Sequence, residues 1–159
     1  MRPLVVLLSI HAPADFDVGA MIATAQRVYA PAEISLIASS TRSPSDLEID
    51  SVGDRNLLRD EVDDATIHVF VVDRLADKKR ADLAIGGVHW YHRGRRYFIV
   101  SRVDGRHDTF AHELGHYFGL RHTVDRSNIM APPDRVRDAR LTPDQQRRAR
   151  RGASSRAVN

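Results

Sequence analysis

Residues 112–122 read His112-Glu113-Leu114-Gly115-His116-Tyr117-Phe118-Gly119-Leu120-Arg121-His122, which is H-E-x-x-H-x-x-G-x-x-H. On an α-helix four residues turn through about 400° and rise about 6 Å, so His112 and His116 lie on one face, one turn apart. This spacing predicts two ligands of one metal ion. Glu113 lies about 100° around the helix from His112, which predicts a carboxylate beside the metal that does not bind it.

The third histidine requires the helix to end. In a continuous helix His122 would lie about 240° around from His116 and about 9 Å further along, pointing away from the metal. Gly119 can adopt the left-handed conformation that ends a helix and turns the chain back. We therefore predict Gly119 as a conformational residue and His122 as the third ligand.

The alternative to a metal site is an amphipathic core helix that carries incidental exposed histidines. Five fixed residue types in an eleven-residue window arise by chance in well under about one chain in a thousand of ordinary composition. The mechanical coherence of the spacing therefore favours the metal site.

A second motif follows the third histidine. Ser127-Asn128-Ile129-Met130-Ala131-Pro132 places Met130 eight residues after His122. Together the two motifs resemble the metzincin clan of zinc metallopeptidases, in which a methionine turn lies beneath the metal. The resemblance implies one catalytic Zn²⁺ held by the three histidines, with Met130 as an apolar floor that does not bind it.

No metzincin subfamily can be assigned from these residues. Ile-Met-Ala-Pro is similar to the Met-turn of the adamalysin-like branch, whereas the spacing from His122 to Met130 resembles the matrixins. No tyrosine stands two residues after Met130, so the tyrosine ligand of astacin-like and serralysin-like members is not supported. The chain also contains no cysteine, unlike archaemetzincins and reprolysins.

Bulk composition indicates one soluble globular domain. The content is 42% hydrophobic and 28% charged, and 159 residues are enough to bury a core. No apolar run is long enough to span a bilayer. The short run Leu4–Ile10 is followed by Pro13 and acidic residues, so we interpret it as a first strand and not as a signal peptide. We accordingly expect a cytoplasmic protein and a monomer.

Positive charge gathers near the end of the printed sequence. The net charge is +3, and four arginines lie between residues 147 and 151. A solvated face of a terminal helix explains them, and no aromatic platform accompanies them. The pattern does not favour a nucleic-acid partner.

The first half of the chain predicts a parallel crossover unit followed by a third strand. Asp15 or Asp17 is expected to cap the first helix, which Pro31 ends. The expected segments are strands at 4–10, 34–38 and 66–72, a helix from about 18 to 30, a surface connection at 39–64 with a short helix at 56–62, and a loop at 74–82.

Residues 85–91 and 97–100 flank a turn at Gly94 and predict a hairpin. Metzincins use an antiparallel edge strand here to pair with substrate, so the resemblance assigns residues 86–91 to it. Backbone groups of an unpaired edge can bind an extended peptide. The candidate substrate-binding residues are Gly86, Gly87, Val88 and His89. In the alternative, Gly86-Gly87 marks only a bulge, and the side chains of His89 and Trp90 are structural.

Asp104 is the expected cap of an active-site helix running from about 106 to 118, with His107 on the surface. Residues 123–140 look irregular, and Thr142 and Pro143 begin a last helix. The predicted fold is α/β (α+β), a twisted mixed sheet of about five strands with a backing helix and an active-site helix. It forms a single domain over 1–159, divided into subdomains 1–119 and 120–159, the second small, irregular and ending in a helix.

These features predict a zinc-dependent endopeptidase acting on a peptide or protein substrate. Glu113 would take a proton from a water activated by the metal and deliver it to the leaving amine. Two alternatives stay open: a catalytically idle metal-binding or protein-interaction module on the same fold, and a basic nucleic-acid-binding protein.

Overall fold

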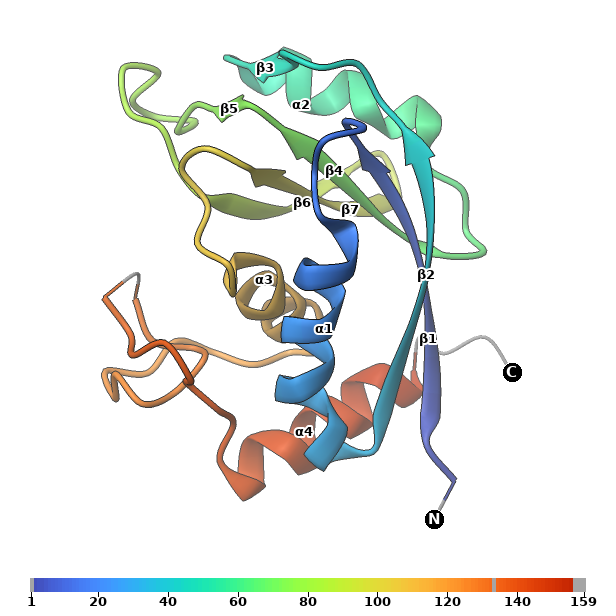
Figure 1. Cartoon of the computed structure of the whole chain (residues 1–159), viewed down its shortest axis with the longest axis vertical. Helices are drawn as coiled ribbons and strands as arrows, with labels where there is room; N and C mark the ends of the chain where they lie inside the picture. Colours follow the sequence, from blue (N-terminus) through green and yellow to red (C-terminus); the bar gives the residue numbers. More distant parts are fainter. Residues whose placement is uncertain (1, 133, 156–159) are drawn as a thin grey trace.

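The structure, a computed structural model, describes residues 2–132 and 134–155. Its main element is a five-stranded mixed sheet in the order β2-β1-β4-β7-β6 (Figure 1). Four strands are parallel, and β6 pairs antiparallel with β7 at one edge. The strands are β1 (Leu4–Ala12), β2 (Ile34–Arg42), β4 (Ile67–Val72), β6 (Gly87–His92) and β7 (Arg95–Ser101). The predicted fold class is confirmed.

Helix α1 (Val18–Tyr29) completes the crossover between β1 and β2. Of the two candidate caps, Asp17 is the one used, because its carboxylate accepts the N–H of Ala20 at 2.8 Å. Asp15 instead forms an ion pair with Arg102. The helix then passes into a 3₁₀ turn, Ala30–Ala32, which contains Pro31.

Apolar side chains fill both faces of the sheet. Every residue of β4 is buried, so this strand is covered on both faces. One core lies beneath α1, α3 (Thr109–Tyr117) and α4 (Pro143–Ser154). A smaller core lies on the other face, under α2 (Val52–Leu57) and a two-stranded sheet of β3 (Glu48–Ile49) and β5 (Arg74–Leu75).

The 39–64 connection is more structured than the sequence predicted. Its α-helix is Val52–Leu57 and not 56–62, because Ser51 and Asp54 form a capping box that begins the helix earlier. A 3₁₀ turn, Leu58–Glu61, then follows. β2 extends to Arg42, and neither β3 nor β5 was predicted, since strands of two residues carry no periodicity.

The prediction for the start of α3 was wrong. The helix begins at Thr109 and not near 106, and Asp104 does not cap it, because the Asp104 carboxylate accepts the hydroxyl of Ser101. The Thr109 hydroxyl accepts the Arg106 N–H at 2.7 Å, which holds the preceding turn outside the helix. Asp108 stands at the N-cap position, but its carboxylate makes no capping bond.

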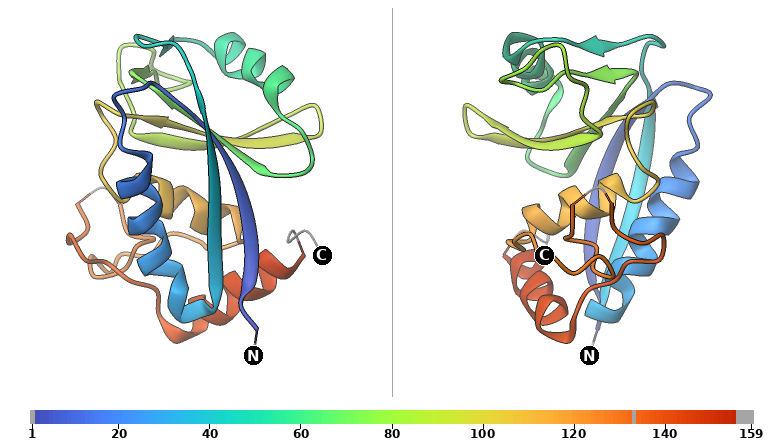
Figure 2. Two further views of the ribbon diagram at one scale, coloured as in Figure 1. Left: turned by 45° about the vertical axis from the view of Figure 1, so that its right-hand side comes forward. Right: turned by 90° about the vertical axis from the view of Figure 1, so that its left-hand side faces the viewer.

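The last part of the chain follows its prediction. Residues 123–140 contain no helix or strand among those described, apart from an isolated bridge between Asn128 and Arg140. Thr142 caps α4 with Pro143 in the first turn. In Figure 2, α3 lies between the β6–β7 hairpin and the pair formed by the 120–140 segment and α4. Among the described residues, no helix has the length and apolar character needed to cross a membrane.

Candidate metal centre

Helix α3 presents His112, Glu113 and His116, and the chain then reverses at Gly119. Gly119 has φ +86°, the left-handed conformation that the sequence predicted. The N–H of Gly119 donates to the carbonyl of His116 at 3.0 Å, and the N–H of Leu120 donates to that of Gly115 at 2.9 Å. This pair of bonds is a Schellman motif, which ends the helix and directs the following residues back along it.

We expect Gly119→Val to lower the free energy of unfolding by more than about 1 kcal/mol, because a β-branched side chain is forced into a left-handed conformation. The displaced turn should also weaken zinc binding by about tenfold or more, which competition against a chromophoric chelator would measure. Gly94→Val is the matched control, since Gly94 has φ +84° in the hairpin turn and equally open space around it. A Gly119→Val variant with the zinc affinity of Gly94→Val would contradict the prediction.

The reversal brings three imidazoles together. Nε2 of His122 lies 3.2 Å from Nε2 of His112 and 3.0 Å from Nε2 of His116. Zinc–nitrogen bonds of about 2.0–2.1 Å in a tetrahedron place ligand atoms roughly 3.3 Å apart, so these separations fit one zinc ion. Among the described residues, these three histidines form the one cluster suited to hold a metal ion.

Backbone carbonyls fix the orientation of two of the rings. Nδ1 of His112 lies 2.7 Å from the carbonyl oxygen of Ile129, and Nδ1 of His116 lies 3.1 Å from that of Leu120. A carbonyl can only accept, so each Nδ1 carries the proton and each Nε2 presents a lone pair to the centre. The donor set therefore has the tautomers that a metal requires.

Burial favours the neutral form of the two helical imidazoles, His112 and His116. It lowers the pKa of His112 from 6.5 to about 4, with smaller contributions from the positive charges of Arg135, His116 and His122, although a hydrogen bond to the Ile129 carbonyl opposes the shift. Burial also lowers the pKa of His116. Neutral imidazole is the form that binds a metal, so both residues are prepared for it at neutral pH.

Met130 lies directly beneath the turn that joins the two helical ligands. It is fully buried, and a Cβ added to Gly115 would lie 2.3 Å from its sulfur. Its backbone N–H donates to the side chain of Asn128, and Asn128 exchanges two amide hydrogen bonds with Gln145 of α4. Met130 therefore occupies the position of an apolar floor, and α4 supports the turn that carries it.

Glu113 lines the same cavity as His112 and His122 and lies outside the ligand cluster. Its carboxylate accepts a hydrogen bond from the backbone N–H of His89 on β6. Burial raises its pKa from 4.5 to about 7, and the hydrogen bond and the charge of Arg135 only partly oppose this shift. A carboxylate with a pKa near neutrality can both accept and release a proton there.

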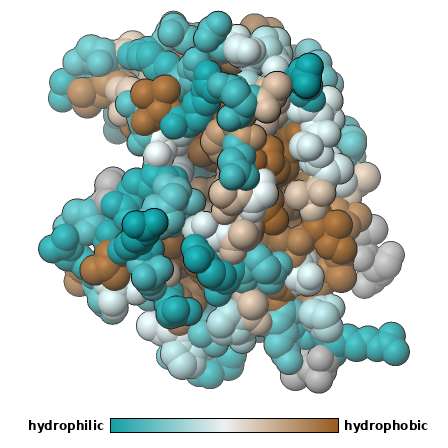
Figure 3. All heavy atoms as spheres, in the orientation of Figure 1, coloured by the Kyte–Doolittle hydropathy of each residue, from teal (hydrophilic) through white to brown (hydrophobic). Residues whose placement is uncertain are grey.

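A cavity of about 320 Å³ opens beside these groups. Ile85, Gly86 and Gly87 line one side, Pro132 and Arg135 line the other, and Glu113 and two of the histidines lie between. Figure 3 shows the surface notched on its left side, between the part that carries the β5–β6 connection and the 120–140 segment. The centre is thus open to a ligand from solvent.

The edge strand β6 approaches α3 closely at Gly87. A Cβ at this position would lie 2.6 Å from the Thr109 side chain, so glycine is required by proximity. Pairing with β7 is continuous from Gly87 onward, which does not support a bulge within the strand. The His89 ring packs against Phe98 and Tyr117, with centroids 5.2 and 5.4 Å away.

Val88 and Trp90 of the same strand face the smaller core. Val88 packs against it, and the Trp90 indole donates to Asn56 at 3.0 Å. The side chains of His89 and Trp90 are thus structural, and the edge strand offers its backbone to the cleft. His107 is exposed, as predicted.

Three charged residues near the centre were missed from the sequence. Asp108 and Arg135 form a buried ion pair, and Arg106 contacts the same carboxylate. Asp108 precedes His112 by four residues, so helical spacing could have placed both on one face. Nothing distinguished Arg135 among the other arginines of its irregular segment.

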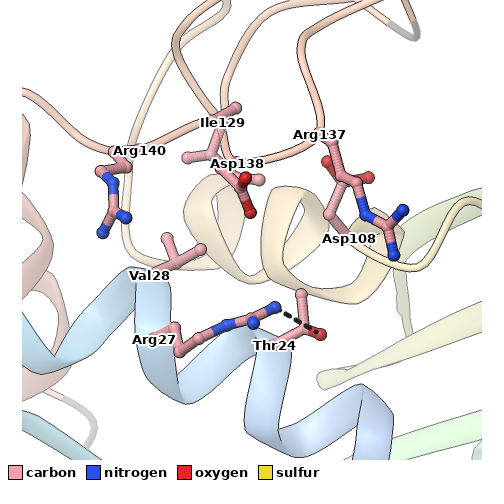
Figure 4. A pocket seen from close by; sticks show the side chains of 9 residues that line it. Thr24, Arg27, Val28, Asp108, Ile129, Arg137, Asp138 and Arg140 are labelled. Atoms are coloured by element: carbon pink, nitrogen blue, oxygen red, sulfur yellow. Dashed lines mark hydrogen bonds between the residues drawn. The ribbon is translucent and has the colours of Figure 1, made fainter.

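A second, smaller cavity of about 90 Å³ lies on the far side of α3, between α1 and residues 137–140. Figure 4 shows its lining, with Arg27 bonded to Thr24 and the side chains of Arg137 and Arg140 directed apart around Asp138. None of the three histidines or Glu113 lines it, so it is separate from the metal centre.

Comparison with known families places these features in context. The sequence profile of metallopeptidase family M12B, reprolysin-like, matches residues 38–123, which is more than half of the chain. The matched region contains the edge strand, the whole of α3 and all three histidines. Comparison with curated proteins finds no match.

Solved structures share the fold at low sequence identity. Metalloproteinase-II from Bacteroides fragilis has a TM-score of 0.67 and 17% identity over 94% of this chain, which spans only 53% of that protein. Archaemetzincin from Methanopyrus kandleri has a TM-score of 0.63 and 14% identity, over 96% of both chains. A zinc-dependent peptidase from Methanocorpusculum labreanum has a TM-score of 0.55 and 15% identity, over 92% of this chain and 99% of its own.

Proposed function

The chain belongs to the reprolysin-like metallopeptidase family M12B, and on that premise we propose that it is a zinc-dependent endopeptidase. Membership supports a metallopeptidase that acts on peptides or proteins. The observation that supports the proposal best is the convergence of three imidazole Nε2 atoms beside a carboxylate that is not a ligand. A purely structural zinc site would be closed by four protein ligands, whereas this cluster offers three and borders an open cavity.

His112, His116 and His122 would hold the ion through Nε2. Bound zinc supplies a Lewis acid that lowers the pKa of a water molecule and polarises a carbonyl group. Glu113 accepts the proton of the attacking water and later donates it to the departing amine. Its pKa of about 7 matches this double task, and burial is the main cause of that value.

The substrate is expected to bind along β6. This strand is the edge of the sheet next to the metal centre, and its outer backbone groups are not paired with another strand. An extended peptide can add to such an edge through main-chain hydrogen bonds, which do not depend on its side chains. Because Glu113 accepts the N–H of His89, the strand also orients the proton carrier.

Digestion of a diverse peptide library, read by mass spectrometry, tests the proposal. The peptides should be blocked at both ends, so that only internal cleavage is scored. We expect internal cleavage that a chelator abolishes and added zinc restores. A parallel library with free ends covers the other outcomes. Cleavage confined to that library would indicate an exopeptidase, and stoichiometric zinc without cleavage in either library would favour the idle metal-binding module.

The acid limit of activity should come from Glu113 and not from loss of zinc. The acid limb of the pH profile should begin at about pH 7 or lower. Below that point, protonation of Glu113 should reduce kcat/KM about tenfold for each pH unit. Since burial lowers the pKa of both helical histidines, zinc should remain bound at pH 6. Elemental analysis after filtration, at each pH of the kinetic profile, would measure retained zinc. If zinc is lost over the same pH range as activity, the acid limit comes from protonation of the histidine ligands and not from Glu113.

A further inference from the structure

A buried ion pair joins the beginning of α3 to the segment that follows Met130. Nη2 of Arg135 lies 2.7 Å from one carboxylate oxygen of Asp108, and Nε lies 2.9 Å from the other. The two side chains are only 4% and 2% exposed. Two parallel hydrogen bonds of this kind fix both the distance and the relative orientation of their partners.

On the helix side, the ion pair is one turn from a candidate metal ligand. The N–H of His112 donates to the carbonyl of Asp108 at 3.0 Å, so the two residues share a turn of α3. Asp108 stands at the N-cap, yet its carboxylate makes no capping bond and is used by arginine instead. The position of the His112 backbone therefore follows that of Asp108.

On the loop side, the same arginine holds the Met-turn. Nη1 of Arg135 donates to the carbonyls of Ala131 at 3.3 Å and Pro132 at 3.4 Å. Ala131 follows Met130, and Ile129 precedes it. The Ile129 carbonyl is the group 2.7 Å from Nδ1 of His112.

These contacts close a ring through the site. It runs from Asp108 along one helical turn to His112, across to Ile129, around the Met-turn to Arg135, and back to Asp108. Figure 4 shows Ile129 and Asp108 on the same side of α3, at opposite ends of its first turns. Within this circuit of contacts, Asp108 holds the His112 backbone and the Ile129 carbonyl holds the His112 imidazole.

We infer that Arg135 is a positioning residue for the metal centre, because its buried ion pair with Asp108 sets the distance between the His112 backbone and the carbonyl that orients the His112 ring. Lysine could not replace it, because its ammonium group is a single point charge and cannot make the two parallel hydrogen bonds that the planar guanidinium makes to Asp108. Arg106 supports the same carboxylate at 3.2 Å and donates to the Arg135 carbonyl at 3.1 Å, so it steadies the pair from outside.

The test compares Arg135→Lys with Arg126→Lys. Arg126 lies in the same irregular segment, but its ion pair with Asp134 is about two-thirds exposed, so it is a matched control. Zinc affinity is measured at a temperature where both zinc-free variants are folded, by competition against a chromophoric chelator. We expect Arg135→Lys to weaken zinc binding about 10- to 100-fold, the usual effect of losing a partner that orients a ligand. Arg126→Lys should change it less than about twofold.

Two further measurements separate positioning from general stability. The visible spectrum of the cobalt-substituted protein reports ligand geometry, and we expect it to change in Arg135→Lys and not in Arg126→Lys. Lysine is shorter than arginine and glutamate longer than aspartate, so Asp108→Glu combined with Arg135→Lys should recover part of the lost affinity. If Arg135→Lys does not fold, Asp108→Asn takes its place in both measurements. If the folded Arg135→Lys or Asp108→Asn variant keeps the zinc affinity and the cobalt spectrum of the wild type, the inference is overturned.

The inference rests on the proposed function only in taking His112 as a metal ligand. Zinc affinity and the cobalt spectrum are measured without substrate. An inactive wild type would therefore contradict the proposed endopeptidase and leave this test intact. Unchanged zinc binding in an active enzyme would contradict the positioning role alone.

Discussion

Glu113→Gln should retain about one zinc ion per chain and lose at least roughly two orders of magnitude in kcat, the lower end expected for acid–base catalysis. That loss corresponds to about 2.7 kcal/mol of transition-state stabilisation. The amide keeps the size of the side chain but cannot take up the proton of the attacking water. Because Glu113 lies outside the ligand cluster, zinc binding should survive the change.

Elemental analysis and single-turnover kinetics on the same sample check both parts of this prediction. Glu61→Gln is the matched control, since Glu61 is exposed on a 3₁₀ turn and is not among the residues that line the metal cavity. Its kcat should equal that of the wild type. Activity of Glu113→Gln near the wild-type value would exclude Glu113 as the proton carrier, and loss of its zinc would make it a ligand.

Removal of zinc at pH 7.5 should lower both activity and stability. A ligand bound only by the folded state contributes about 2.7 kcal/mol when its concentration exceeds Kd 100-fold. For a chain of this length that corresponds to a fall in Tm of roughly 5–10 °C. The physical reason is local: without a cation, Nε2 of His122 lies about 3 Å from Nε2 of each of the other two histidines and no shared ion holds the three rings together.

Calorimetry with and without a chelator measures this fall, and added zinc should reverse it. The control is His122→Ala, which removes one ligand from an exposed position at little cost to packing. Its Tm should respond much less to zinc than that of the wild type. A wild-type Tm that is indifferent to zinc would contradict a metal centre formed by these three residues.

The sequence was most informative where function restricts residue type and spacing together. The H-E-x-x-H spacing and Gly119 predicted the helix, its end and the return of His122, because each step follows from helical geometry. Thr142 and Pro143 predicted the start of α4 for the same local reason. The run of residues 66–72 predicted a third strand, and β4 lies within it.

Prediction failed where side-chain hydrogen bonds and ion pairs, some local and some between distant residues, determine the structure. Asp104 looked like a helix cap, but the Ser101 hydroxyl engages its carboxylate, and Thr109 fixes the turn before α3. The partnership of Asp108 with Arg135 joins residues 27 positions apart, and no periodicity records it. Gly87 is needed because β6 approaches α3 closely at this residue. The sequence could not show this, since the two elements come together only in the folded chain.

The contact between α4 and α3 has a consequence for the order in which the molecule matures. A Cβ at Gly152 would lie 2.2 Å from the carbonyl oxygen of Phe118, so α4 rests directly on the end of α3, and Gln145 holds the Asn128 side chain beneath the Met-turn. A ribosome makes α4 after it has made every histidine of the centre. During synthesis the ligands are therefore present before the support that arranges them, and tight capture of zinc must wait until this later helix has docked.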